Sequence, residues 1–178
     1  GMRVVDACAG AGGKTLHLAA LMKNKGNIIA LDTKDFKLAE LKKRAKRAGA
    51  AIIESRLIDS TKVIKRLKDS ADRLLLDVPC SGLGVLRRNP DTKWMLKPEE
   101  IDNVIKTQRE ILERFSPITK VGGMMVYATC SILPSEGKEQ INWFLEQNSN
   151  WALEGEKQYS PLSFDCDGFY MALLKRNS

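Results

Sequence analysis

The chain has 178 residues, 43% of them hydrophobic, a composition that excludes an intrinsically disordered protein and suits a single domain with one core. No apolar run is long enough to cross a bilayer and no secretory segment opens the chain, so we expect neither a membrane protein nor a secreted one. The formal net charge of +7 fits a nucleic-acid partner and a merely solvated basic surface equally well.

Strand and helix patterns alternate along the whole chain. In chain order we expect a strand at 3–7, a helix at 14–22, a strand at 27–32, a helix at 35–48, a short strand at 51–54, a short helix at 61–68, a strand at 73–77, a long loop at 80–97, a helix at 98–115, a strand at 124–128, a helix from 134 or 135 to 147, and strands at 151–153 and 168–174. This alternation predicts an α/β fold with a doubly wound, mostly parallel sheet. Such sheets bind ligands beyond the carboxyl ends of their strands.

A glycine-rich turn follows the first strand, with the sequence Asp-Ala-Cys-Ala-Gly-Ala-Gly-Gly-Lys-Thr at residues 6–15. A phosphate-binding loop requires glycine where Cys8 stands, and a dinucleotide fingerprint requires glycine where Thr15 stands, so both motifs are incomplete. A third interpretation is S-adenosylmethionine, whose amino and carboxylate groups suit the backbone of the turn and an acid such as Asp6. The turn alone does not decide between these ligands.

Two further acids follow the next strands. Asp32 ends the second strand, where a carboxylate can accept both hydroxyls of a ribose, and Asp59 follows the third strand, within reach of an adenine amino group. Each acid alone is more often a helix cap or part of a solvated turn. Acids at three successive strand ends favour a nucleoside-containing ligand.

The four cysteines, Cys8, Cys80, Cys130 and Cys166, are widely spaced, and His17 is the one histidine. We therefore expect no zinc site and no disulfide framework, but reduced thiols in a cytoplasmic protein. Cys80 and Cys130 each lie just past a buried strand. If these strands are neighbours in a sheet ordered 3-2-1-4-5, both thiols face one cleft. Cys8 is assigned to the lining of the glycine turn and Cys166 to the core.

Two thiols beside Asp77 fit covalent chemistry on cytosine. A thiolate that adds to C6 makes C5 nucleophilic, so that C5 can take a methyl group from a sulfonium. Asp77, if it is protonated or shares a proton, can bond to N3. A thiolate at neutral pH needs nearby positive charge, for which Lys14 and the arginines of the long loop are candidates.

These residues resemble the Sun/Fmu-type RNA 5-methylcytosine methyltransferases. The similarity lies in Asp77–Gly82 with Val85–Trp94 behind it, in Tyr127–Pro134, in Gly12–Thr15 and in Asp167–Tyr170. It extends from end to end of the chain, and the two cysteine motifs together are highly specific. The resemblance implies a Rossmann-like class I methyltransferase fold with seven strands in the order 3-2-1-4-5-7-6, the last strand antiparallel, and helices on both faces.

The resemblance also implies roles for individual residues. Cys130 would be the nucleophile, Cys80 would aid release of the product, Asp77 would contact the cytosine, and Lys14 would border the catalytic pocket. S-adenosylmethionine would be held by Cys8, Ala9, Gly10, Ala11, Gly12, Gly13, Lys14, Asp32, Asp59 and Asp77. The family usually has proline at the position of Ala11, a departure that removes no functional group.

The implied substrate is RNA, with ribosomal RNA expected, and we expect a monomer with no metal and no membrane partner. Residues 1–178 would form the catalytic domain, and the amino-terminal RNA-binding region of the family is absent from this chain. Arg87, Arg88 and Lys93 are expected to contact the RNA backbone, with Trp94 either stacking on a base or packing in the core. The basic run at residues 42–47 is interpreted as a solvated helix face.

Two alternatives stay open. One is a DNA cytosine methyltransferase, in which Cys80 would attack the base. The other is a catalytically silent RNA-binding module that keeps the fold.

Overall fold

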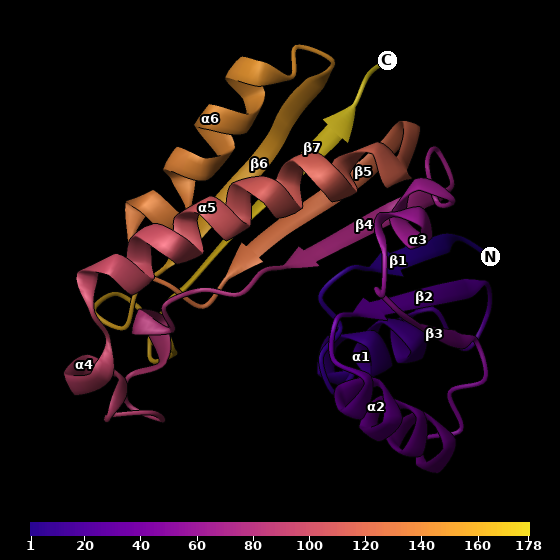
Figure 1. The fold of residues 1–178 in the computed structure, drawn as a ribbon, viewed down its shortest axis with the longest axis horizontal. Helices are drawn as coiled ribbons and strands as arrows, with labels where there is room; N and C mark the ends of the chain where they lie inside the picture. Colours follow the sequence, from indigo (N-terminus) through magenta and orange to yellow (C-terminus); the bar gives the residue numbers. More distant parts are fainter.

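The structure, a computed structural model, describes residues 1–178 and contains one seven-stranded sheet (Figure 1). The strands are β1 (Arg3–Asp6), β2 (Asn27–Asp32), β3 (Ile53–Leu57), β4 (Ala71–Asp77), β5 (Thr119–Thr129), β6 (Trp151–Tyr159) and β7 (Phe169–Arg176). They lie in the order β3-β2-β1-β4-β5-β7-β6. Strands β1 to β5 pair in parallel, and β7 runs antiparallel to β5 and β6. The predicted Rossmann-like fold and strand order are confirmed.

Six α-helices and three short 3₁₀ helices connect the strands. The α-helices are α1 (Gly13–Leu21), α2 (Asp35–Arg47), α3 (Thr61–Lys65), α4 (Thr92–Met95), α5 (Pro98–Phe115) and α6 (Lys138–Gln147), and the 3₁₀ helices are Leu83–Val85, Ser116–Ile118 and Pro134–Glu136. Helix α5 begins at Pro98, whose missing N–H would be unpaired in the first turn anyway. None of the helices combines the length and the apolar composition that a membrane crossing requires.

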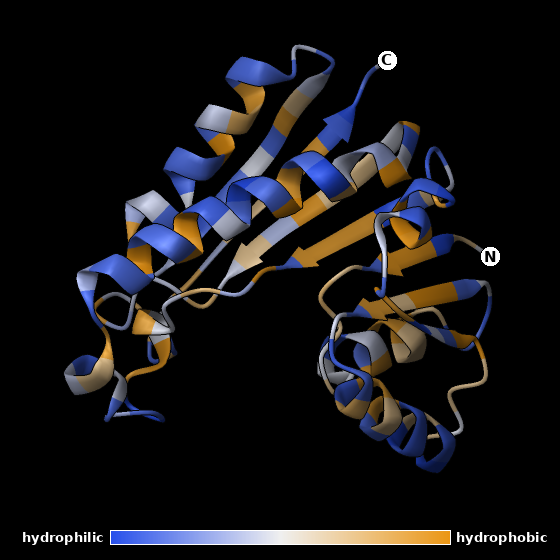
Figure 2. Ribbon diagram, in the orientation of Figure 1, coloured by the Kyte–Doolittle hydropathy of each residue, from blue (hydrophilic) through white to orange (hydrophobic).

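Helices cover both faces of the sheet, because alternate residues of each strand point to opposite sides. On one face, Val4 and Ile28 pack against Ala19 of α1. On the other face, the neighbouring residues Val5 and Ile29 belong to the large core that α5 and α6 complete. Figure 1 shows α5 and α6 over the half of the sheet that contains β4 to β7, and α1 and α2 beside β1 to β3. Strands covered on both faces need near-continuous apolar sequences, which Figure 2 shows for β2 and β4.

Three strands differ most from their predicted bounds. Strand β3 begins two residues later than expected and continues through polar residues, and β6 extends to Tyr159 through the polar segment Glu154–Gln158. Both are edge strands of the sheet, so solvent reaches them and an apolar run is not required. Strand β5 begins at Thr119 instead of residue 124. Its first half was not predicted because Gly122 and Gly123 are typical of a turn.

Two connections also differ from prediction. The expected loop at 80–97 contains the 3₁₀ helix Leu83–Val85 and helix α4. The helix expected from residue 134 opens as a separate 3₁₀ helix that ends at Glu136, and α6 begins only after Gly137. Four parallel strands end at one edge of the sheet, at Asp6, Asp32, Asp77 and Thr129. The glycine turn and both cysteine loops therefore start from the same edge.

Candidate active site

The glycine turn reverses the chain after β1 through two left-handed glycines, Gly10 (φ 55°) and Gly12 (φ 87°). A side chain at Gly12 would also collide with α2, since a Cβ there would lie 2.6 Å from Cγ of Leu41. The guanidinium of Arg44 donates to the carbonyl of Ala11 over 2.9 Å. Helix α2 therefore fixes the turn from outside, and alanine at position 11 leaves it well held.

Asp32 joins the turn to the end of β2. Its Oδ2 accepts the backbone N–H of Gly10 at 2.9 Å, and its Oδ1 accepts the N–H of Lys34 at 2.8 Å. The carboxylate thus shapes the turn, and it also lines a cavity beside the turn.

Asp6 supports the turn from below. It is 1% exposed, its Oδ2 accepts the hydroxyl of Thr15 at 2.7 Å, and its Oδ1 has no hydrogen-bond partner. Burial raises the pKa of this carboxyl to about 6. Asp6 does not line the cavity beside the turn. Its position therefore gives no support to a direct contact with the ammonium group of a ligand.

A cavity of about 400 Å³ opens at the carboxyl edge between the glycine turn and α5. Its apolar lining is Ala7, Ile58, Val78, Pro79, Ile111 and Phe115, and its polar lining is Cys8, Gly10, Asp32, Thr33, Lys34, Lys37, Asp77, Thr107, Glu110 and Arg114. Of the predicted cofactor residues, Cys8, Gly10, Asp32 and Asp77 line this cavity. The remaining turn residues, Ala9, Ala11, Gly12, Gly13 and Lys14, do not line it.

Asp59 also lies outside this lining. It is exposed, and its Oδ1 accepts the hydroxyl of the adjacent Ser60 at 3.0 Å. The residue before it, Ile58, lines the cavity instead. The α5 residues were missed at the sequence level, because an amphipathic helix gives no sign of which ligand it faces.

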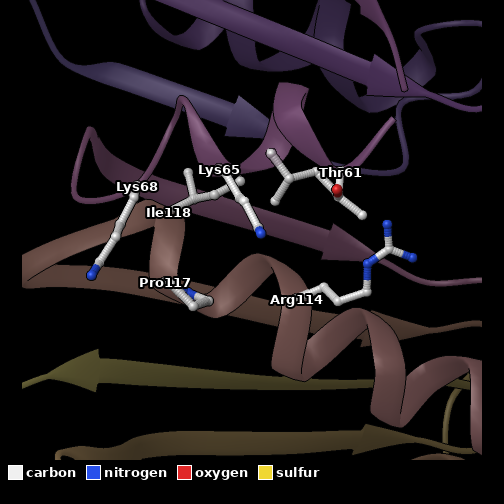
Figure 3. A pocket seen from close by; sticks show the side chains of 7 residues that line it. Thr61, Lys65, Lys68, Arg114, Pro117 and Ile118 are labelled. Atoms are coloured by element: carbon white, nitrogen blue, oxygen red, sulfur yellow. The ribbon is translucent and has the colours of Figure 1, made fainter. Parts of the chain in front are cut away.

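A second cavity, of about 480 Å³, lies between α3 and the end of α5 (Figure 3). Its lining includes the basic side chains of Lys65, Lys68 and Arg114, together with the apolar residues Ile64 and Ile118. It contains no carboxylate, no thiol and no residue that the sequence singled out. The first cavity is therefore the candidate active site.

The thiols of Cys80 and Cys130 meet beside the first cavity. Their Sγ atoms lie 3.0 Å apart, and both cysteines are free and half-buried. They follow β4 and β5, which pair in parallel up to Asp77 and Ala128. The expected convergence of the two sulfurs is present, and Cys80 directly follows cavity residue Pro79.

Proximity makes the two thiols unequal. A hydrogen bond from the S–H of Cys80 lowers the pKa of Cys130 to about 7, with a smaller contribution in the same direction from Lys14. The same hydrogen bond, together with burial, raises the pKa of Cys80. Cys130, whose pKa is lowered, is therefore the thiol that gives up its proton first, and Cys80 stays protonated as the donor to it.

Lys14 forms an ion pair with Asp77 across the mouth of the site. Its Nζ lies 2.6 Å from Oδ2 of Asp77 and 5.8 Å from the centre of the Phe169 ring. Asp77 therefore lies beside an ammonium, and its Oδ2 is engaged by Lys14.

Glu136 is the main residue that the sequence interpretation missed. It is fully buried, at 0% exposure, and accepts four hydrogen bonds. Oε1 accepts the hydroxyls of Ser81 (2.5 Å) and Ser131 (2.6 Å), while Oε2 accepts the N–H of Ser81 (2.8 Å) and the amide of Gln108 (3.1 Å). The available signal was an acid in a short turn after the second cysteine, which also describes an ordinary helix start.

The loop after Cys80 is tied to the segment before β7. Arg87 and Arg88 both pair with Asp167, at 2.7 and 2.8 Å. They therefore anchor this loop, in addition to any contact with RNA. Trp94 of α4 is 79% exposed, with Nζ of Lys93 4.7 Å from the centre of its ring. Core packing of Trp94 is thus wrong, and a stacking role remains.

Of the other two cysteines, Cys8 is a poor nucleophile and Cys166 lies outside the site. Burial, followed by nearby carboxylates, raises the pKa of Cys8 to about 12, which fits a lining role. Cys166 is half-buried in the loop before β7, so its assignment to the core is wrong. No group of three or more His, Cys, Asp or Glu side chains with a geometry for metal binding is present.

A family model described as "16S rRNA methyltransferase RsmB/F" matches residues 1–175. The chain belongs to this family. Ribosomal RNA small subunit methyltransferase B of Yersinia enterocolitica is 38% identical over 188 residues, which cover 99% of this chain and 43% of that protein. The resemblance that the cysteine motifs indicated is confirmed.

Solved structures agree with this assignment. The crystal structure of PH0851 is 36% identical with a TM-score of 0.94, and covers 99% of this chain and 43% of its own. NSun6 from Pyrococcus horikoshii, solved with SFG, is 26% identical with a TM-score of 0.89, and the match covers 99% of this chain and 48% of that one. The chain spans less than half the length of each of these proteins.

Proposed function

We propose that this chain transfers a methyl group from S-adenosylmethionine to C5 of a cytosine in ribosomal RNA. The observation that carries the proposal is the pair of thiols 3.0 Å apart, one of them with a lowered pKa, next to a cavity edged by carboxylates. Family membership supports the reaction class and the ribosomal RNA substrate.

The cavity fits the methyl donor by its chemistry. Its apolar wall, which includes Ile58, Val78 and Phe115, suits a flat nucleoside base, and its acids Asp32 and Asp77 suit a positively charged sulfonium. The N–H groups of the glycine turn suit a carboxylate. When bound, S-adenosylmethionine supplies an electrophilic methyl group.

Cys130 begins the reaction on the base. Its thiolate adds to C6 of the cytosine, a carbon–sulfur bond forms, and the electron pair of the C5–C6 double bond makes C5 nucleophilic. C5 then takes the methyl group as the bond between that group and the donor sulfur breaks; the electron pair of this bond stays on the donor sulfur, and C5 still carries its hydrogen. Asp77 accepts a hydrogen bond from the exocyclic amino group of the cytosine, and Lys14 donates to the electron-rich side of the ring.

Cys80 completes the reaction. Once Cys130 is bonded to the ring, Cys80 loses the acceptor that raised its pKa, and its proton passes to water. The resulting thiolate removes the hydrogen from C5, the C6–sulfur bond breaks, and its electron pair returns to Cys130. The resting pair, one thiolate and one thiol, is restored, and one proton has been released overall.

The exposed surface of the segment that follows Cys80 supports an RNA substrate. The base of the segment that carries α4 is held by Arg87 and Arg88, and its tip exposes Trp94 next to the cation of Lys93. Aromatic rings that stack on unpaired bases, together with cations near phosphates, are a common arrangement in proteins that bind single-stranded RNA.

The test exchanges each cysteine separately, with unmethylated 16S rRNA as substrate. Cys130→Ala should abolish methylation, because no thiolate can add to C6. Cys80→Ala should accumulate a protein–RNA adduct that survives a denaturing gel, because the C5 hydrogen stays in place. Cys166→Ala, a cysteine outside the site, is the matched control.

The outcomes separate the alternatives. An active Cys130→Ala protein would refute the proposal. A trapped adduct in Cys130→Ala but not in Cys80→Ala would favour attack by Cys80, as in the DNA-type alternative. RNA binding without binding of S-adenosylmethionine, measured by calorimetry, would favour the silent module.

A further inference from the structure

We propose that Glu136 is a positioning residue that holds both cysteine loops and thereby sets the distance between the two sulfur atoms. The proposal rests on the proposed role of Cys130 as the nucleophile, although its test does not require RNA. It assigns a function to a buried carboxylate that touches neither the cavity nor the reacting atoms.

The contacts of Glu136 are distributed between the two loops. Ser81 directly follows Cys80, and Ser131 directly follows Cys130. A single oxygen atom, Oε1, accepts the hydroxyls of both serines, which lie 3.3 Å apart. One carboxylate oxygen thus fixes the residues next to both thiols, 50 positions apart in the sequence.

Each serine also fixes its own loop. The backbone N–H of Leu83 donates to Oγ of Ser81, and that of Leu133 donates to Oγ of Ser131. Each serine oxygen therefore accepts from the backbone two residues further on while its hydroxyl donates to Glu136. The direction of the hydroxyl groups is set on both sides, which makes the arrangement rigid.

The carboxylate is fastened to the surrounding fold as well. Gln108 of α5 donates to both Oε2 of Glu136 and the carbonyl of Pro79, at 3.1 and 3.0 Å. The phenol of Tyr127, in β5, donates to the backbone carbonyl of Glu136 at 2.9 Å. Glu136 therefore connects the two cysteine loops to helix α5 and strand β5.

The chemistry of the site requires an acid at this position. All four groups around the side chain are donors, and a carboxylate provides acceptors for all of them. A glutamine of the same shape would present an NH₂ group to at least one of these donors. Glu136→Gln is therefore a disruptive substitution, despite its equal size.

The position of the sulfurs decides their chemistry. Cys130 owes its lowered pKa first to the hydrogen bond from Cys80, a bond that needs the two loops in register. If Glu136 releases either loop, the sulfurs separate and the pKa of Cys130 returns towards the ordinary value of 9.0. A residue that only supports folding would lower the melting temperature without this change.

The experiment measures the rate at which iodoacetamide alkylates Cys130 between pH 5.5 and 9.5, followed by mass spectrometry of the peptide that contains it. The unaltered chain should give a midpoint near 7. In Glu136→Gln the midpoint should rise by one unit or more, so that alkylation at pH 6.5 falls by about tenfold. Glu139→Gln, the same substitution on the exposed side of α6, should leave the midpoint unchanged.

A second variant covers the case in which Glu136→Gln does not fold. Ser131→Ala removes one of the four donors and should raise the midpoint in the same direction by a smaller amount. A folded Glu136→Gln or Ser131→Ala with an unchanged midpoint would overturn the positioning role. Because alkylation involves no RNA, failure of the proposed RNA reaction would appear only in the adduct experiment with the cysteine variants.

Discussion

The candidate site has two halves, a proposed cofactor half around the glycine turn and a thiol half around Cys80 and Cys130. One buried carboxylate supports each half, and the protein surrounds the two carboxylates differently. Asp6 lies under the glycine turn with one donor, the hydroxyl of Thr15, and one unpartnered oxygen. Glu136 lies behind the cysteine loops with four donors. Burial of a charge is unfavourable unless hydrogen bonds replace the lost water, so the half with the thiols is much better compensated.

The difference reflects what each half does. The glycine turn presents backbone groups, whose positions follow from two left-handed glycines and the nearby α2. The thiol half must hold two sulfur atoms 3.0 Å apart, which backbone conformation alone does not specify. The cofactor half should therefore tolerate changes of charge, whereas the thiol half should respond sharply to small displacements.

Among the substitutions that compare the two halves, Gly84→Ala, in the thiol half, should have the largest effect on methylation. The N–H of Gly84 donates to the carbonyl of Cys130 at 3.0 Å, and its carbonyl accepts from Gly168 at 2.7 Å. An added Cβ would collide with the Gly168 carbonyl oxygen and lie 2.8 Å from that of Cys130. Since these are backbone atoms, the loops must move, which should lower the free energy of unfolding by about 1–3 kcal/mol and methylation by about 100-fold.

Chemical denaturation and a methylation assay measure these two effects. The control is Gly155→Ala in β6, because a Cβ at Gly155 meets no atom within 4 Å. Equal stability and activity in the two alanine variants would contradict the close packing that sets the thiol half apart.

Sequence reasoning succeeded where the information is local or follows from strand order. The glycine spacing predicted the turn, and the position of Cys80 and Cys130 after neighbouring strands predicted their convergence. It could not find Glu136, because the contact with Ser81 spans 55 residues and depends on how two loops fold back. The length of β6 was also missed, because an edge strand pairs through its backbone and shows no apolar pattern.

The next effect concerns Lys14, which joins the two halves. It pairs with Asp77 and lowers the pKa of Cys130, so Lys14→Met should leave the Asp77 charge unopposed and raise that pKa. Because the thiolate is the reactive form, the rate in the unaltered chain should rise with pH up to about 7 and then level off. The variant should level off at higher pH and be about 3-fold slower at pH 7.

A pH–rate profile of methylation, with Lys43→Met on the exposed face of α2 as the control, tests this prediction. The ratio between the unaltered chain and Lys14→Met should fall towards pH 9, because the effect on the thiol disappears there, and the lost contact with the ring should leave a constant residual difference. A constant ratio between Lys14→Met and the unaltered chain at every pH would assign Lys14 to substrate binding alone.

The smallest expected effect on methylation is that of Asp6→Asn, which should instead give a gain of stability in the cofactor half. The pKa of Asp6 is raised from 3.8 to about 6, so its folded state holds a proton that the unfolded chain has lost between these values. The stability that Asp6 contributes is therefore fully present below pH 3.8 and lost as pH rises through about 6. An uncharged asparagine, whose carbonyl still accepts from Thr15, avoids this loss.

Thermal unfolding at pH 4 and pH 7.5 measures the gain of Asp6→Asn, with the exposed Asp102→Asn of α5 as the control. At pH 7.5 the gain should be about 1–3 kcal/mol, or several degrees in melting temperature, and it should disappear at pH 4. A gain of equal size at both pH values would mean that packing, and not charge, is responsible. A gain confined to pH 7.5 would show that Asp6 is a poorly compensated acid beneath the turn of the cofactor half. Glu136, the buried acid of the thiol half, has four hydrogen-bond donors instead.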